Sequence, residues 1–195
     1  MNRKKILLDV DEVICFSGFL EAVNEFLDTN YTIDDFTDYY IDEVAIPKER
    51  LDEFNQFVAS RNAYKNPIML PDAIKTIERL NSYYDIFICT SCVNPFDPLE
   101  SGETMKKKFL FLMEYLPFIN PNNYIFTSSK GLIKGDIIID DRLPNLDTDI
   151  ETKILFPSYH NKDISEIELE EKGIIRAGYN WRTGWKEVEK ILIKK

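Results

Sequence analysis

Five short apolar runs, rich in β-branched and aromatic residues, recur along the 195-residue chain and constrain its fold more than any other feature. They are continuous rather than alternating, as expected for strands that are buried on both faces. Segments with apolar residues at helical spacing separate them. The runs occupy residues 5–10, 85–89, 124–127, 136–140 and 153–156. This alternation predicts an α/β fold, a Rossmann-like parallel sheet with helices on both faces.

One long interval interrupts the alternation. Nearly seventy residues (16–84) separate the first run from the second, whereas a crossover between parallel strands needs about a dozen. Helical patterns occur at 17–27 and 51–58, and the first 60 residues hold fourteen acidic side chains against five basic ones. We therefore predict a small helical cap, inserted after the first strand, at the sheet edge where open α/β folds bind ligands. The predicted core comprises 1–15 and 85–195, and the insertion 16–84 returns to the core near 71–84.

The composition excludes several kinds of partner. A net charge of −10 disfavours binding to a nucleic-acid polymer, which needs a basic surface. Three cysteines form no disulfide framework and suit a reducing compartment. No apolar run reaches the roughly 18–20 residues that span a membrane. We expect a soluble, cytoplasmic protein with no membrane or nucleic-acid partner, and a homodimer is left open.

Two pairs of carboxylates stand where predicted strands end. Asp9 and Asp11 lie at the end of the first strand, and Asp140 and Asp141 follow the three isoleucines at 137–139. Acidic side chains at the end of a buried strand are costly unless they are paired or bind a metal. Their oxygens suit Mg²⁺. A solvated turn after each strand is the alternative interpretation.

Hydroxyl and lysine side chains follow two further strands. Thr90 and Ser91 come after the second run, where hydroxyls and free N–H groups can hold a phosphate, although such residues also cap helices. Lys130 follows the third run and could neutralise phosphoryl charge, with Lys134 as its local competitor. A parallel sheet would gather all these side chains at one edge, because the carboxyl ends of its strands meet there.

The order of these motifs, Asp-x-Asp, Thr, Lys and Asp-Asp, resembles that of the haloacid dehalogenase-like superfamily of phosphohydrolases. The stretches 8–13 and 87–91 further resemble the 5′(3′)-deoxyribonucleotidase family. In that family the motif lysine stands ten positions before the first aspartate of the last motif, as Lys130 does before Asp140. This spacing selects Lys130 over Lys134, and the resemblance covers roughly residues 5–190.

The resemblance implies a Mg²⁺-dependent phosphatase that hydrolyses deoxyribonucleoside monophosphates, 5′ or 3′ and with a pyrimidine preference, to deoxyribonucleoside and phosphate. Asp9 would be the nucleophile that forms an aspartyl-phosphate, and Asp11 the general acid and base. Mg²⁺ would be held by the Asp9 and Asp141 carboxylates and the Asp11 backbone carbonyl, with Asp140 in support behind Asp141 or Lys130. Phosphoryl oxygens would be held by Thr90, Ser91 and Lys130.

The resemblance also implies that the insertion covers the site and stacks aromatic side chains on the base. Phe16 is the first candidate because it closely follows the first motif. Three tyrosines are further candidates that could equally form the core of the cap: Tyr39, Tyr40 and Tyr64. Two alternatives stay open, a phosphatase of the same superfamily for another small phosphomonoester such as a sugar phosphate, and a catalytically silent nucleotide-binding module.

Two residues remain to be placed. Glu12 occupies the position after the second aspartate of the first motif, where the family usually has glycine. Glycine there eases a tight turn, so Glu12 either changes the backbone or adds a carboxylate near the metal. His160, the only histidine, lies in a polar loop, and we expect it on the surface.

Overall fold

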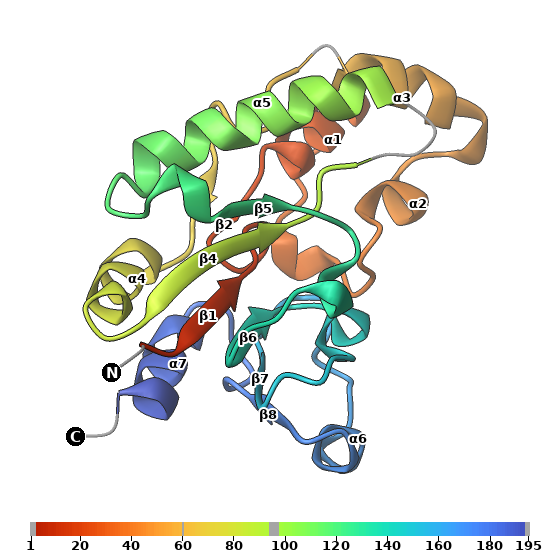
Figure 1. Cartoon of the computed structure of the whole chain (residues 1–195). Helices are drawn as coiled ribbons and strands as arrows, with labels where there is room; N and C mark the ends of the chain where they lie inside the picture. Colours follow the sequence, from red (N-terminus) through yellow and green to blue (C-terminus); the bar gives the residue numbers. More distant parts are fainter. Residues whose placement is uncertain (1–2, 60, 94–97, 194–195) are drawn as a thin grey trace.

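The computed structural model describes residues 3–59, 61–93 and 98–193. Its centre is a six-stranded parallel sheet in the order β5-β4-β1-β6-β7-β8 (Figure 1). The five predicted strands are present and a sixth, β8, is added at one edge. In chain order they are β1 (Lys5–Leu8), β4 (Asp85–Thr90), β5 (Tyr124–Phe126), β6 (Ile137–Asp140), β7 (Thr152–Leu155) and β8 (Ile174–Arg176).

Both faces of the sheet are buried, as the continuous apolar runs predict. In β1, Ile6 and Leu8 pack in one core cluster together with apolar residues of α4 (Ala73–Asn81) and α7 (Gly184–Leu192). Leu7 points to the opposite face and packs in a second cluster with Leu169 of α6 (Glu166–Glu171). Successive side chains of a strand alternate between faces, so an unbroken apolar run supplies both clusters.

The helices lie where apolar periodicity predicts them, with shifted ends. Apolar residues at helical spacing between positions 73 and 80 lie in α4, and those between 185 and 192 lie in α7. A further set at helical spacing, which begins at Met105, lies in a longer helix, α5 (Pro98–Tyr115). None of the helices in the described ranges is long and apolar enough to cross a membrane.

Within its described residues, the insertion contains three short α-helices, α1 (Phe19–Leu27), α2 (Ile41–Ala45) and α3 (Leu51–Ala59). It is closed by an antiparallel pair, in which β2 (Cys15–Phe16) leaves the core and β3 (Ile68–Met69) returns to it. Figure 1 shows α1, α2 and α3 on the side of the sheet to which β1 and β4 point. The next helix, α4, packs against β4 and α7. The insertion therefore stands over the carboxyl ends of the central strands.

Candidate active site

The backbone turns sharply directly after β1. The carbonyl of Val10 accepts hydrogen bonds from the N–H groups of Ile14 at 2.8 Å and Cys15 at 3.3 Å. Glu12 within this turn has a φ of +61°, a left-handed conformation that costs a residue other than glycine about 1–2 kcal/mol. The backbone therefore has the conformation that glycine would favour, although Glu12 occupies the position.

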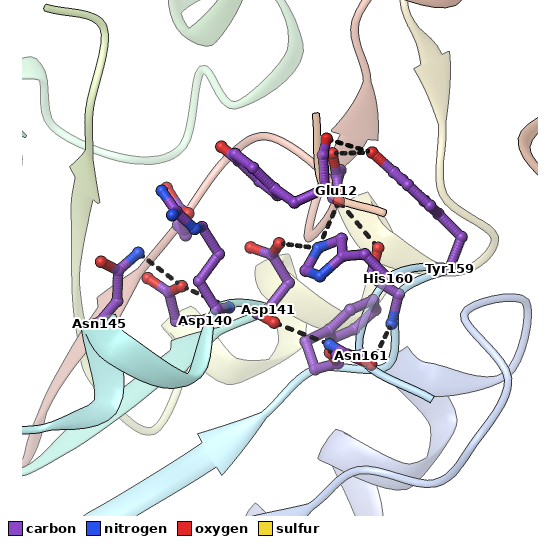
Figure 2. Close-up of polar contacts among 12 residues, drawn as sticks. Glu12, Asp140, Asp141, Asn145, Tyr159, His160 and Asn161 are labelled. Atoms are coloured by element: carbon purple, nitrogen blue, oxygen red, sulfur yellow. Dashed lines mark hydrogen bonds and ion pairs between the residues drawn. The ribbon is translucent and has the colours of Figure 1, made fainter. Parts of the chain in front are cut away.

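A buried lysine joins two of the predicted carboxylates. Lys130 Nζ lies 2.9 Å from Asp9 Oδ2 and 2.5 Å from Asp140 Oδ2, and all three side chains are buried. The other oxygen of Asp140 accepts hydrogen bonds from Arg142 N and Asn145 Nδ2, each at 2.9 Å (Figure 2). Burial and then the charge of Asp9 raise the pKa of Asp140 to about 6. Because both oxygens of Asp140 are occupied, this residue holds Lys130 in place beside Asp9.

Asp141 lies next to this cluster with one oxygen turned to His160. Its Oδ2 is 2.8 Å from His160 Nε2, and its backbone carbonyl accepts a hydrogen bond from Asn161 Nδ2 at 2.7 Å. Oxygens of Asp9, Asp140 and Asp141 lie within 4.8 Å of one another. Burial raises the pKa of Asp141 well above its usual range, and neighbouring carboxylates act in the same direction. A buried set of carboxylate oxygens that repel one another fits a hard divalent cation such as Mg²⁺.

Asp11 is held by a residue that the sequence analysis missed. Lys108 Nζ on α5 lies 2.5 Å from Asp11 Oδ2, 3.1 Å from Thr90 Oγ1 and 2.7 Å from the carbonyl oxygen of Ser91. The hydroxyl of Tyr64 donates a hydrogen bond of 2.6 Å to the other oxygen, Asp11 Oδ1. The sequence does contain an indication that Lys108 faces inward. It lies on the same helical face as Leu112 and Tyr115, which follow it by four and seven positions.

The motif residues surround a small cavity of about 50 Å³. Thr90 ends β4 as a buried residue, and Ser91 Oγ lies 2.7 Å from Ser128 Oγ. Lys130 is buried at this cavity, whereas its competitor Lys134 is exposed. The structure thus brings the four motifs together at one edge of the sheet. The predicted residues that line the cavity are Asp9, Asp11, Tyr39, Thr90, Ser91, Lys130 and Asp141.

A much larger cavity of about 1310 Å³ adjoins the small one, and the two share Asp11, Glu12 and Ser91 among their lining residues. Its wall also includes Trp181, whose ring packs edge-on against Phe16 with the ring centroids 5.1 Å apart. The predicted aromatic candidates all line it: Phe16, Tyr39, Tyr40 and Tyr64. The hydroxyl of Tyr64 also donates a hydrogen bond to Asp11, which lines both cavities.

His160 is not a surface residue, and the sequence-based expectation for it is wrong. Its side chain is 8% exposed, and its Nε2 lies 2.8 Å from both Glu12 Oε2 and Asp141 Oδ2 (Figure 2). Burial lowers the pKa of His160, but hydrogen bonds to Asp141 and Glu12 outweigh this and raise it to about 9. The position of His160 in the sequence was an indication of its role. The residue closely follows β7, and it therefore lies at the edge of the sheet where the motif residues gather.

The fold, together with the sequence family that the chain matches, makes this protein a haloacid dehalogenase-like hydrolase that acts on phosphoric monoesters. Two solved structures share the fold at 16% identity. A haloacid dehalogenase-like hydrolase from Streptococcus pneumoniae gives a TM-score of 0.53, with 90% of this chain and 94% of that chain covered. A hydrolase of the same class from Bacillus subtilis, bound to magnesium, gives a TM-score of 0.51, with 98% of this chain and 99% of that chain covered.

More specifically, the chain belongs to the family described as 5′ nucleotidase, deoxy (pyrimidine), cytosolic type C protein, whose model matches residues 3–193. Among its relatives is the 5′(3′)-deoxyribonucleotidase of Bacillus subtilis, 25% identical over 193 residues, with 98% of this chain and 99% of the relative covered. The protein of the same name from Bacillus phage SPbeta matches with the same identity and coverage.

Proposed function

We propose that this protein is a Mg²⁺-dependent phosphatase that hydrolyses deoxyribonucleoside monophosphates, with a preference for pyrimidines, to deoxyribonucleoside and phosphate. The observation that carries the proposal is the junction of two cavities, a small charged one at Asp9 and Lys130 and a large aromatic one beyond Asp11. A phosphoryl group suits the first and a nucleoside suits the second. The names of the relatives from Bacillus subtilis and phage SPbeta support the same substrate class.

In the first step, a carboxylate oxygen of Asp9 attacks phosphorus and the bond from phosphorus to the nucleoside oxygen breaks. Asp11 gives a proton to the departing oxygen. In the second step, water attacks the aspartyl-phosphate, Asp11 takes a proton back, and phosphate leaves as Asp9 is regenerated. Lys108 and Tyr64 donate to the two oxygens of Asp11 and so fix the position of its carboxylate.

Positive charge is the main requirement of the site, since an anionic nucleophile meets an anionic substrate. Lys130 beside Asp9, together with Thr90 and Ser91 in the wall of the same cavity, would hold the phosphoryl oxygens. Asp140 keeps Lys130 in place. Mg²⁺ bound by the carboxylates of Asp9 and Asp141 and the backbone carbonyl of Asp11 would offset the remaining repulsion and orient the phosphoryl group.

The insertion would act as the cap over this site and contribute the base-stacking surface. Phe16, Tyr39 and Tyr40 line the large cavity, which supports their assignment to the nucleoside. Tyr64 is better assigned to Asp11, because its hydroxyl is committed to that carboxylate and its ring is buried.

The test is phosphate release from a panel of deoxyribonucleotides, ribonucleotides and sugar phosphates, each with Mg²⁺ and with EDTA. We expect Mg²⁺-dependent turnover that is fastest with pyrimidine deoxyribonucleoside monophosphates. Turnover confined to phosphomonoesters without a base would assign the protein to another substrate. Absence of turnover with every phosphomonoester would make it a binding module.

A further inference from the structure

The contact of His160 with two carboxylates is not used by the reaction described above. We propose that His160, held by Glu12, is a positioning residue that fixes the orientation of the Asp141 carboxylate for the divalent cation. The inference rests on the proposed function, because Asp141 is assigned there as a Mg²⁺ ligand. It adds two residues, Glu12 and His160, to the machinery of the site.

The geometry divides the oxygens of Asp141 between two tasks. Oδ2 lies 2.8 Å from His160 Nε2. Among the residues that the structure describes, none makes a hydrogen bond to Oδ1 of Asp141, and carboxylate oxygens of Asp9 and Asp140 lie within 4.8 Å of the Asp141 carboxylate. The histidine therefore holds one oxygen and leaves the other for an ion beside Asp9.

Glu12 contacts the same ring nitrogen of His160 that faces Asp141, and so adds a second carboxylate to this contact. Its Oε2 lies 2.8 Å from His160 Nε2 and also accepts a hydrogen bond of 2.8 Å from Ser158 Oγ. The second oxygen, Oε1, accepts a hydrogen bond of 3.0 Å from the hydroxyl of Tyr159 (Figure 2). Both oxygens of Glu12 are thus occupied by the loop that carries His160, and the carboxylate ties this loop to the turn after β1.

The three side chains are largely buried. The side chains of His160, Asp141 and Glu12 are 8%, 2% and 15% exposed. Water cannot readily replace a lost hydrogen bond at such a site, so the orientation of Asp141 depends on the protein itself. The backbone of the same loop adds a second restraint, because Asn161 Nδ2 donates to the carbonyl oxygen of Asp141 at 2.7 Å.

Hydrogen bonds that orient a metal-binding carboxylate typically change metal affinity by about 10–100-fold when removed. Loss of the imidazole should therefore weaken Mg²⁺ binding while leaving the nucleoside cavity intact. His160→Gln should restore part of the effect, since an amide can still donate a hydrogen bond to Asp141. Lys162→Ala, an exposed position in the same loop, is the matched control.

The experiment is isothermal titration of Mg²⁺ into the metal-free protein, with circular dichroism as a check on folding. We expect the dissociation constant to rise about 10–100-fold in His160→Ala, less in His160→Gln, and not at all in Lys162→Ala. Excess Mg²⁺ should restore most of kcat in His160→Ala, with KM for the nucleotide unchanged. A folded His160→Ala protein that binds Mg²⁺ as tightly as the wild type would overturn the inference.

The two proposals fail in distinguishable ways. Wild-type protein that binds no Mg²⁺ would contradict the proposed function itself. Wild-type protein that binds Mg²⁺ with an affinity that His160 does not influence would contradict only the positioning role. If His160→Ala does not fold, Glu12→Gln provides the test. Weaker Mg²⁺ binding in this variant would support the positioning role of Glu12 and His160, and unchanged binding would refute it.

Discussion

Lys108 and Asp11 form an ion pair between residues 97 positions apart in the chain, with Nζ of the lysine 2.5 Å from Oδ2 of the aspartate. The lysine side chain is 1% exposed and lies on α5, whereas the aspartate lies in the turn after β1. The same ammonium group donates to Thr90 Oγ1 and to the carbonyl of Ser91. The proposed general acid is therefore tied to the hydroxyl motif at the end of β4.

Replacement of Lys108 by methionine should slow the reaction without abolishing it. Asp11 would lose the cation that holds its proton-transferring carboxylate, and general acid–base catalysis is worth about 10²–10⁴-fold. We expect kcat to fall about 100-fold, as measured by phosphate release at saturating nucleotide. Lys106→Met, at a position 68% exposed on the same helix, is the control. Equal kcat values for the two variants would argue against a role for Lys108.

Replacement of Lys130 by methionine should reduce both stability and activity. Asp9 and Asp140 would be left buried without their shared cation, and breaking a buried ion pair from one side costs about 3–5 kcal/mol. Urea denaturation should show a loss of about 3 kcal/mol in the free energy of unfolding. The exposed Lys134→Met variant should match the wild type, and a Lys130→Met protein of wild-type stability would contradict the buried cluster.

The left-handed backbone at Glu12 can be tested by comparing two substitutions. Glu12→Gly and Glu12→Ala both remove the carboxylate, but only glycine relieves the strain of a φ of +61°. The glycine variant should be the more stable of the two by about 1 kcal/mol, measured as the free energy of unfolding in urea. An alanine variant as stable as the glycine variant would show that the strain is absent.

Replacement of Phe16 by leucine should separate base recognition from chemistry. Leucine keeps apolar volume at this buried position but removes the ring, and stacking of a base on an aromatic ring is worth about 1–3 kcal/mol. We expect KM for deoxyribonucleotides to rise about 10-fold and KM for a phosphomonoester without a base to stay constant. A parallel rise for both substrates would place Phe16 outside base recognition.

The core strands and the gathering of the motifs could be predicted from the sequence, because both follow from local pattern and from the rules of parallel sheets. Three consecutive isoleucines, at 137–139, predict a buried strand, and all three are buried. An aspartate that directly follows such a strand lies at the carboxyl edge of the sheet. β8 escaped prediction because a three-residue edge strand has no measurable periodicity.

Helical periodicity could have placed Lys108 on the buried face of its helix, but the roles of Lys108 and His160 depend on contacts with remote parts of the chain. Lys108 directly follows the exposed Lys106 and the half-buried Lys107 on one helix, and only its helical face distinguishes it. His160 lies in a polar loop whose sequence suits the surface, yet contacts with Glu12 and Asp141 bury it. The polarity of neighbouring residues does not predict exposure where buried charged side chains pair with one another.

The central claim, that Asp9 is the nucleophile, is tested most directly by acid quench during the first turnover of a deoxyribonucleotide, followed by peptide mass mapping. The account predicts a transient gain of one phosphoryl group on the peptide that contains Asp9. Asp9→Asn should retain the circular dichroism spectrum of the wild type, show no such gain and release phosphate at least about 10³-fold more slowly. A phosphoryl group on a different residue, or near wild-type turnover by Asp9→Asn, would contradict the account.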